Sequence, residues 1–380
     1  MTLSVKEWLK ENLKGDYHIW GVVLFLSVMS LAVVYSATGT MAYRKMESTE
    51  LYLFKHGALV LAGLFCMWFA HRINYVNYAR LSRFGMWLSV PLLLWAYFKG
   101  ASLNDASRWI TIPIINQTFQ PADLAKLALI SNLAAMLAKR QYVQYEPRIL
   151  INLIGWIGLI CACIMLTNAS TAVLLAATCF LLMFIGRVPG RYLLAMVVFC
   201  VILGGAALYV GQRYETFKGR INRHIETMQG KRAPDYQVEQ SFIALAHGSL
   251  YGRGPGNSHQ RNYLPHPYSD FIFAMIVEEY GLIGGLTIMA AYLYLLWRGM
   301  RAIQKANRAF GGLLSAGLTF SIVIQAMINM AVAVGLVPVT GLPMPLLSMG
   351  GSSMLFIGTA IGIIISVSRG DLEENKLFAK

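Results

Sequence analysis

Three carboxylates lie close together where a polar loop runs into an apolar segment, within RNYLPHPYSDFIFAMIVEEYGLIGG from Arg261 to Gly285. Asp270 lies at the junction, and Glu278 and Glu279 follow inside the apolar segment. If a helix begins near Asp270, Glu278 is roughly 12 Å further along it, at about 1.5 Å per residue. In a membrane that depth is hydrocarbon, where a carboxylate costs about 2.5 kcal/mol or more and marks a candidate functional site.

The same carboxylates also have structural interpretations. Asp270 at the start of a helix would accept hydrogen bonds from the free amides of the first turn. Glu278 and Glu279 would pair with basic groups that have no part in chemistry. As a functional group, Asp270 would act as a general base or as a ligand of a divalent metal ion. The sequence leaves these alternatives open.

The composition indicates a polytopic integral membrane protein. Of 380 residues, 57% are hydrophobic and only 13% are charged, whereas a soluble domain has roughly 25% charged residues. The net charge of +14 comes from basic residues in short loops between apolar runs, a pattern that fixes membrane topology, so nucleic-acid binding is excluded. The five cysteines lie in apolar segments without metal-ligand spacing, and neither disulfides nor zinc are expected.

Ten apolar runs predict an all-α integral membrane protein with about ten transmembrane helices in one polytopic domain, residues 1–380. The first run is too long for the core of a cleaved signal peptide and is expected to remain as a span. The predicted spans are 18–38, 51–71, 84–99, 121–138, 149–167, 169–186, 192–211, 271–297, 309–335 and 347–368.

The lysines and arginines of the short connections predict that the N-terminus, residues 1–17, and the C-terminus, residues 369–380, are cytoplasmic. This topology places the long connection 212–269 outside the cytoplasm, and connections of that length are usually functional or disordered. Its basic residues outnumber its acidic ones. The excess suits an anionic ligand or lipid headgroups, and a basic helix resting on the membrane is the alternative for its first half.

Charged residues also flank the connection 100–120. Arg108 is a candidate cation for an anionic substrate, although a snorkelling anchor at the membrane interface is the structural alternative. Asp123 and Lys126 are three residues apart on a predicted helix, so they share a face and can pair. Lys126 has the further options of reaching Glu279, Asp270 or a phosphate.

The segment GLVPVTGLPMPLLSMGGSS, residues 335–353, carries three prolines and several glycines before the last span. Such a composition predicts irregular backbone at membrane depth, which is tolerated where it is buried in protein or lines a cavity. The small residues 350–353 also suit close helix packing. The chain contains no Walker loop, dinucleotide fingerprint, HExxH or GxSxG motif, so ATP-driven, redox and serine-hydrolase functions have no support.

Five motifs follow one another along the chain: NDASRW (104–109), QPADLAK (120–126), YQVEQS (236–241), YLPHPYSDFIFAMIVEEYGLIG (263–284) and GLVPVTGLPMPLLSMGGSS (335–353). In this order they resemble the RodA/FtsW/SpoVE proteins of bacterial shape, elongation, division and sporulation. The resemblance implies a peptidoglycan glycosyltransferase of the bacterial inner membrane that polymerises lipid II, the undecaprenyl-pyrophosphate-linked disaccharide peptide, beside a class B penicillin-binding protein.

On this resemblance Asp270 corresponds to the family's catalytic aspartate. The predicted substrate-binding residues are Arg108, Lys126, Glu279, Asp123, Arg261 and His266. Arg108, Lys126 and Glu279 match charged positions that line the family's central cavity, and Asp123 stands where Glu is usual. One departure is TNASTA at 167–172, which replaces the family's QPDxGT and lacks its acidic residue. The residues around HPYSDF are more similar to the FtsW branch of the family.

The chemistry implied is the formation of a glycosidic bond from a pyrophosphate-linked sugar. It requires a base for the proton of the acceptor hydroxyl and cations for the departing pyrophosphate. Asp270 would be that base, or would hold a divalent ion, Mg²⁺ or Mn²⁺, against the diphosphate. A single carboxylate without a second nucleophilic one favours inversion at the anomeric carbon.

Two other classes of function compete with the enzyme. A lipid flippase or ion-coupled transporter would also carry charged residues within its spans, but transporters usually show internal repeats and paired broken helices. Neither is visible in the sequence. A structural scaffold for the penicillin-binding protein is the third hypothesis.

Overall fold

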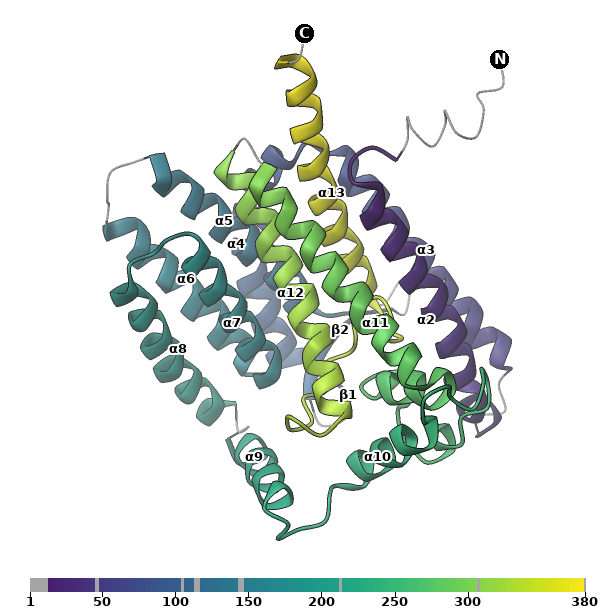
Figure 1. Ribbon diagram of the computed structural model, residues 1–380. Coiled ribbons are helices and arrows are strands. Elements are labelled where there is room, and N and C mark those ends of the chain that lie inside the picture. Colours follow the sequence, from purple (N-terminus) through teal and green to yellow (C-terminus); the bar gives the residue numbers. More distant parts are fainter. Residues whose placement is uncertain are drawn as a thin grey trace, which may run out of the picture.

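The computed structural model describes residues 13–44, 48–103, 106–112, 117–142, 147–211, 214–305 and 308–378. This part of the chain is a bundle of long helices (Figure 1). The helices that coincide with the ten predicted spans are α2 (Tyr17–Arg44), α3 (Thr49–Arg72), α4 (Tyr75–Lys99), α5 (Pro121–Tyr142), α6 (Pro147–Met165), α7 (Ala169–Ile185), α8 (Gly190–Val210), α11 (Ile272–Lys305), α12 (Ala309–Ala333) and α13 (Ser352–Phe378). The predicted helical membrane fold is therefore confirmed.

Eight of the described helices are long and apolar enough to cross a membrane, α7 is apolar but shorter, and α4 falls outside the eight. α5 and α12 have the largest buried share of these spans, whereas α3 and α8 have the smallest. Large apolar side chains are exposed on the outer helices, including Phe54, Phe65 and Val201. Such an outward-facing apolar surface is typical of contact with lipid, so the chain is a multi-pass membrane protein.

α3 and α13 pack closely through glycines. A Cβ atom at Gly358 would lie 2.1 Å from the carbonyl oxygen of Gly63, and one at Gly362 would lie 2.4 Å from that of Met67. Only residues without a side chain allow these backbones to approach so far. Small-residue packing thus occurs within α13, beyond the 350–353 segment where the sequence suggested it.

The connection 100–120 contains a three-stranded antiparallel sheet that the sequence analysis did not predict. Its strands are β1 (Ala101–Leu103), β2 (Ala106–Ile112) and β3 (Gln117–Phe119), in the order β1-β2-β3. The second strand, ASRWITI, is rich in the aromatic and β-branched residues that favour strands. The sheet joins α4 to α5.

The long connection between α8 and α11 is largely helical. It contains α9 (Tyr214–Met228), α10 (Tyr236–Gly248) and a short 3-10 helix, η1 (Gln260–Asn262). α10 packs against α11 and α12, whereas no residue of α9 is buried. Both helices lie at one end of the bundle, and the start of α2 and the end of α13 lie at the other (Figure 1).

The last span begins later than predicted, because α13 starts at Ser352. Residues 334–351, between α12 and α13, are irregular, and this irregular segment is buried over most of residues 342–349. Leu346 has a φ of 65°, a left-handed conformation that is rare for a bulky residue and persists only where neighbours hold it. The prediction of buried, irregular backbone before the last span is confirmed.

Candidate active site

Asp270 precedes the first turn of α11. The carbonyl oxygen of Phe271 accepts hydrogen bonds from the amides of Ala274 at 3.1 Å and Met275 at 3.3 Å. That pattern makes Phe271 the N-cap residue, so Asp270 lies one residue before the cap. Its half-buried carboxylate accepts a hydrogen bond from the Ser269 hydroxyl at 3.0 Å.

The backbone at Asp270 is held from two other elements. The Asn329 amide group, on α12, donates to the carbonyl oxygen of Asp270 at 2.9 Å and to that of Leu342 at 2.9 Å. From the irregular segment, the Ser348 hydroxyl donates to the Ser269 carbonyl at 2.6 Å. The Met349 amide donates to the carbonyl of Tyr268 at 2.9 Å. These contacts fix the peptide that carries the carboxylate, a precondition for placing a reactive group accurately.

The irregular segment is itself anchored by side chains of three helices. Ser30 of α2 donates to the Leu347 carbonyl at 2.9 Å, and Gln325 of α12 donates to the Pro343 carbonyl at 2.8 Å. Tyr292 of α11 donates to the carbonyl of Pro345. Carbonyls that no helix or sheet satisfies are therefore paired within the protein, as burial at membrane depth requires.

Asp123 and Lys126 form the ion pair that their spacing predicted, at 2.8 Å, and both side chains are largely buried. The Lys126 ammonium also donates to the Gln325 side-chain oxygen at 3.3 Å. Gln325 and Asn329 are one helical turn apart on α12, so the same face of α12 contacts Lys126 and the backbone of Asp270. A cavity of about 40 Å³ lies beside the ion pair, large enough for water.

Glu279 and Arg261 lie together against α2. The Ser36 hydroxyl donates to Glu279, which is 1% exposed. The Arg261 guanidinium donates to the Ser36 carbonyl at 3.3 Å and to the Gly256 carbonyl at 2.9 Å. Lys126 thus pairs with Asp123, and Glu279 has Ser36 and Arg261 beside it.

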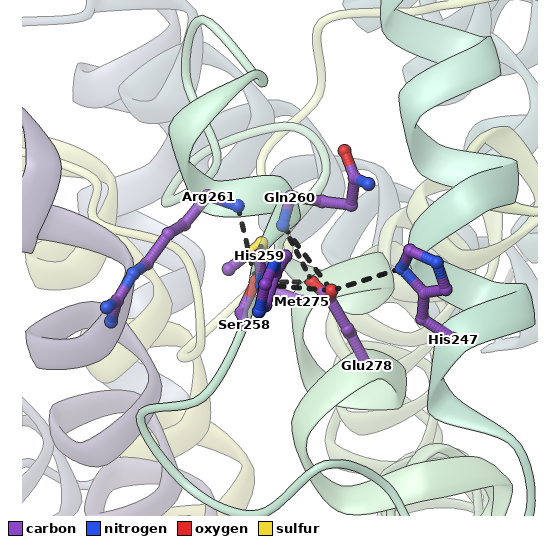
Figure 2. Close-up of polar contacts among 7 residues, drawn as sticks. All are labelled: His247, Ser258, His259, Gln260, Arg261, Met275 and Glu278. Carbon is purple, nitrogen blue, oxygen red and sulfur yellow. Dashed lines mark hydrogen bonds and ion pairs between the residues drawn. The ribbon is translucent and has the colours of Figure 1, made fainter.

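Glu278 organises the loop that follows α10. Its fully buried carboxylate accepts hydrogen bonds from the Ser258 hydroxyl and from the amides of His259 and Gln260, the last two at 3.0 Å and 3.2 Å. His247 lies 3.7 Å away. Figure 2 shows these donors converging on Glu278, while the Arg261 side chain points elsewhere. The partners are mainly amides and a hydroxyl, so Glu278 has a structural role of a kind different from the predicted pairing with basic groups.

α11 is broken at Gly281, two residues after Glu279. Gly281 has φ 71° and ψ −175°, and a Cβ there would lie 2.2 Å from the carbonyl oxygen of Leu250. The break frees the carbonyls of Glu278 and Glu279, which accept from the amides of Arg253 and Gly254, each at 2.9 Å. Glycine is required here both by the conformation and by the close approach of the loop.

His266 and Tyr268 lie on the loop before Asp270. The His266 ring and the Tyr268 hydroxyl are 3.1 Å apart, and His266 is exposed. Burial raises the pKa of the Tyr268 hydroxyl above its ordinary value, and the Asp270 carboxylate raises it further. Tyr268 therefore stays protonated at neutral pH next to the candidate catalytic carboxylate.

Arg108 lies in β2, and its side chain is outside the described part of the structure. The sheet approaches the site through its neighbours, because the Gln120 amide donates to the Ser352 hydroxyl at 2.9 Å. That bond joins the starts of α5 and α13. The substrate-binding role of Arg108 stays a prediction.

The comparison with known proteins gives the family. A family model for FtsW, RodA and SpoVE, described as cell cycle protein, matches residues 16–372. The chain belongs to the FtsW/RodA/SpoVE family. It is 30% identical to a probable peptidoglycan glycosyltransferase FtsW of Geobacter metallireducens over 97% of this chain and 98% of that protein. It is 31% identical to stage V sporulation protein E of Bacillus subtilis over 92% of this chain and 95% of that protein.

Two solved structures share the fold. A chain of a peptidoglycan synthase complex, described for the coordination of polymerization and crosslinking, matches with a TM-score of 0.70 and 22% identity over 94% of this chain and 98% of that one. The rod shape determining protein RodA of Thermus thermophilus matches with a TM-score of 0.66 and 22% identity over 93% of this chain and 97% of that one.

In this FtsW/RodA/SpoVE-family protein, the sequence TNASTA at 167–172, which replaces the family's QPDxGT, has a local structural role. The Asn168 side chain caps α7 by accepting from the Thr171 amide at 3.3 Å. The Thr167 hydroxyl donates to the Ile164 carbonyl at 3.2 Å. Two neutral residues therefore end α6 and begin α7 where the resemblance places an acidic one.

The sequence analysis missed the residues that hold the site in this family member. Asn329, Gln325 and Ser348 connect α12, the irregular segment and the loop before α11. The amides of Asn329 and Gln325 within the apolar run 309–335 were an available signal, because polar residues in a span usually mark a site.

Proposed function

We propose that this protein is a peptidoglycan glycosyltransferase that polymerises lipid II at the outer face of the bacterial cytoplasmic membrane, with both termini in the cytoplasm. The observation that carries the proposal is the position of the Asp270 carboxylate, just before the first turn of α11. Hydrogen bonds from Asn329 and Ser348 hold the backbone on either side of it. Full-length relatives named probable peptidoglycan glycosyltransferases support the same reaction.

In the proposed step, the acceptor sugar hydroxyl gives its proton to Asp270 and its oxygen bonds to the anomeric carbon of the donor. The bond from that carbon to the diphosphate oxygen breaks, and its electron pair leaves with the diphosphate. Direct displacement of this kind inverts the anomeric centre. Lys126 and Arg108 are the proposed cations for the leaving diphosphate, because charge that develops there is best met by fixed positive groups.

A divalent ion, Mg²⁺ or Mn²⁺, belongs to the same proposal. The described residues contain no cluster of three or more His, Cys, Asp or Glu side chains that would hold an ion alone. A single carboxylate together with substrate phosphates is a common arrangement for Mg²⁺, so Asp270 fits this mode. When bound, the ion would supply neutralisation of the diphosphate charge.

We further propose a class B penicillin-binding protein as the partner. Support comes from the structural match to a chain of a peptidoglycan synthase complex. The apolar surface of α8, with exposed Val201 and Ile202, and the unburied α9 are available for contacts of this kind.

A lipid flippase is the second candidate, and one observation favours it. α11 is interrupted at Gly281 next to two buried glutamates, and interrupted helices at membrane depth are typical of transporters. The loop after α10 fills this interruption through the amides of Arg253 and Gly254, which makes it a packed joint and weakens the transport interpretation.

Purified protein with lipid II separates the two functions. In detergent there are no two compartments, so a flippase has no measurable activity, whereas a glycosyltransferase forms glycan polymer when its partner and Mg²⁺ or Mn²⁺ are present. We expect polymer. Movement of lipid II across liposomes without any polymer would replace the enzyme by the flippase.

A further inference from the structure

A second cavity lies at the end of the bundle away from Asp270. It has a volume of about 690 Å³ and is lined by residues of α4, α5 and α6, within the range of roughly 300–1,000 Å³ that is usual for ligand sites. Met86 of α4 and Asn132 of α5 form its buried lining, and the other lining residues are partly or fully exposed. Neither the residues of the proposed reaction nor those that hold the Asp270 backbone line this cavity.

Two cations line the cavity, and no ion pair within the described part of the chain involves either of them. Arg83 comes from α4 and Lys139 from the last part of α5, and both side chains are exposed. None of the described residues that line the cavity is acidic. The described lining therefore carries two positive charges and no negative one, which favours an anion.

Asn132 is a buried residue whose amide lines the cavity. Its side chain is 5% exposed and lines the cavity, and within the described part of the chain no hydrogen bond involves it. The amide is therefore available to donate to a ligand that places an oxygen acceptor at this position.

The deeper part of the cavity is apolar and aromatic. Trp87 of α4 and Trp156 of α6 meet edge to face, with ring centroids 4.8 Å apart and an interplanar angle of 85°. Trp87 lies twelve residues into α4, roughly 18 Å from its first residue at about 1.5 Å per residue. Charge thus lies toward the end of the bundle, and apolar surface lies toward its middle.

The surroundings favour a lipid over a water-soluble anion. Trp87 and Leu159, which line the cavity, are exposed by 65% and 42%. Exposed apolar residues in the lining indicate that the cavity opens toward hydrocarbon. Basic pockets between membrane helices are known sites for anionic lipid headgroups.

We propose that this cavity binds an anionic phospholipid such as phosphatidylglycerol. Its phosphate lies between Arg83 and Lys139, an ester carbonyl accepts from Asn132, and the acyl chains lie over Trp87 and Trp156. With the topology proposed above, the site is in the cytoplasmic leaflet. The site itself does not depend on the glycosyltransferase reaction.

The test is native mass spectrometry of the full-length, delipidated protein with equimolar phosphatidylglycerol and phosphatidylethanolamine of the same acyl chains. We expect at least tenfold greater retention of phosphatidylglycerol. The double variant Arg83→Gln/Lys139→Gln should bring the two lipids within about twofold of each other. The matched control, Arg80→Gln/Arg301→Gln, removes two exposed cations from the same end of the bundle but outside the cavity, and should keep the preference.

Several results would overturn the proposal. Equal retention of the two lipids by the unmodified protein is sufficient alone, even if the double variant does not fold. A double variant that keeps the preference, or a control pair that loses it, would place the selectivity elsewhere. Displacement of the lipid by millimolar sn-glycerol 3-phosphate would mean that phosphate alone is recognised. The measurement does not depend on polymer formation, so the lipid-site proposal can fail while the proposed glycosyltransferase function holds.

Discussion

At the scale of single residues, the site depends on side chains that hold a backbone as much as on the carboxylate itself. Asn329 bonds the carbonyls of Asp270 and Leu342 with one amide group. It contacts no atom of the proposed chemistry, so it is a positioning residue. Its loss would remove both hydrogen bonds and let the segment that carries Asp270 shift.

We predict that Asn329→Leu lowers the turnover of lipid II polymerisation by about 10- to 100-fold, because small displacements of a reactive group have effects of that size. The KM for lipid II should change much less, since binding groups remain. Ser315→Ala is the matched control, as it also removes a buried hydrogen bond of α12, the 3.1 Å bond to the Gly299 carbonyl. Equal losses in both variants would assign a general effect on stability.

The candidate residues differed in how far the sequence could place them. Asp270 stood out as a carboxylate at the junction of a polar loop and an apolar span, and the family resemblance gave it the catalytic role. The Asp123–Lys126 pair followed from helical spacing alone. The contacts of Asn329 and Ser348 could not be predicted, because they depend on how segments far apart in sequence meet.

At the scale of elements, the loop after α10 is joined to α11 through Glu278. Glu278→Gln keeps the side-chain volume but turns one acceptor oxygen into a donor that faces the amides of His259 and Gln260. A mismatched buried group of this kind costs about 1–3 kcal/mol. We expect faster hydrogen exchange in residues 249–262 and little change in α12.

The control for that measurement is Glu226→Gln on the exposed surface of α9, which removes the same charge from the connection that contains the loop but away from the loop. It should leave exchange unchanged. If Glu278→Gln also left the loop unchanged, the carboxylate would not be what holds it.

The break in α11 gives a second prediction. Gly281→Ala places a methyl group where the Leu250 carbonyl lies, in a conformation with positive φ. We expect a loss of stability of at least about 1–3 kcal/mol, seen as a lower Tm in detergent. Gly205→Ala in α8, where a Cβ meets nothing within 4 Å, should leave Tm unchanged or raise it. An unchanged Tm for Gly281→Ala would contradict the packed joint.

The long helices and the irregular segment before the last span could be predicted from the sequence, whereas the break in α11 and the three-stranded sheet could not. Apolar runs of span length placed the ten long helices, since hydrocarbon thickness sets their length. The break at Gly281 and the strands of residues 101–119 are tertiary features. In the sequence, Gly281 looks like any other glycine of a membrane helix, because the loop that packs against it comes from a separate segment of the chain.

At the scale of the whole molecule, the proposed topology places α9 outside the cell and the start of α4 inside. In a variant without native cysteines, a cysteine at exposed Met228 should react with a membrane-impermeant maleimide in intact cells. A cysteine at Asn77, exposed on α4, should react only after the membrane is opened. Labelling of position 77 in intact cells would show that the orientation is the opposite of the one proposed.

The central claim is that the Asp270 carboxylate performs the glycosyl transfer, and the direct measurement is lipid II polymerisation by purified Asp270→Asn beside the unmodified protein, each with partner and divalent ion. Asn keeps the shape but neither accepts a proton near neutral pH nor brings a negative charge to a metal. We predict at least about a 100-fold loss of polymer at unchanged Tm. Asn keeps an oxygen that accepts from the Ser269 hydroxyl, so a purely structural role of Asp270 would leave the rate nearly unchanged, and full activity in Asp270→Asn would contradict the catalytic role.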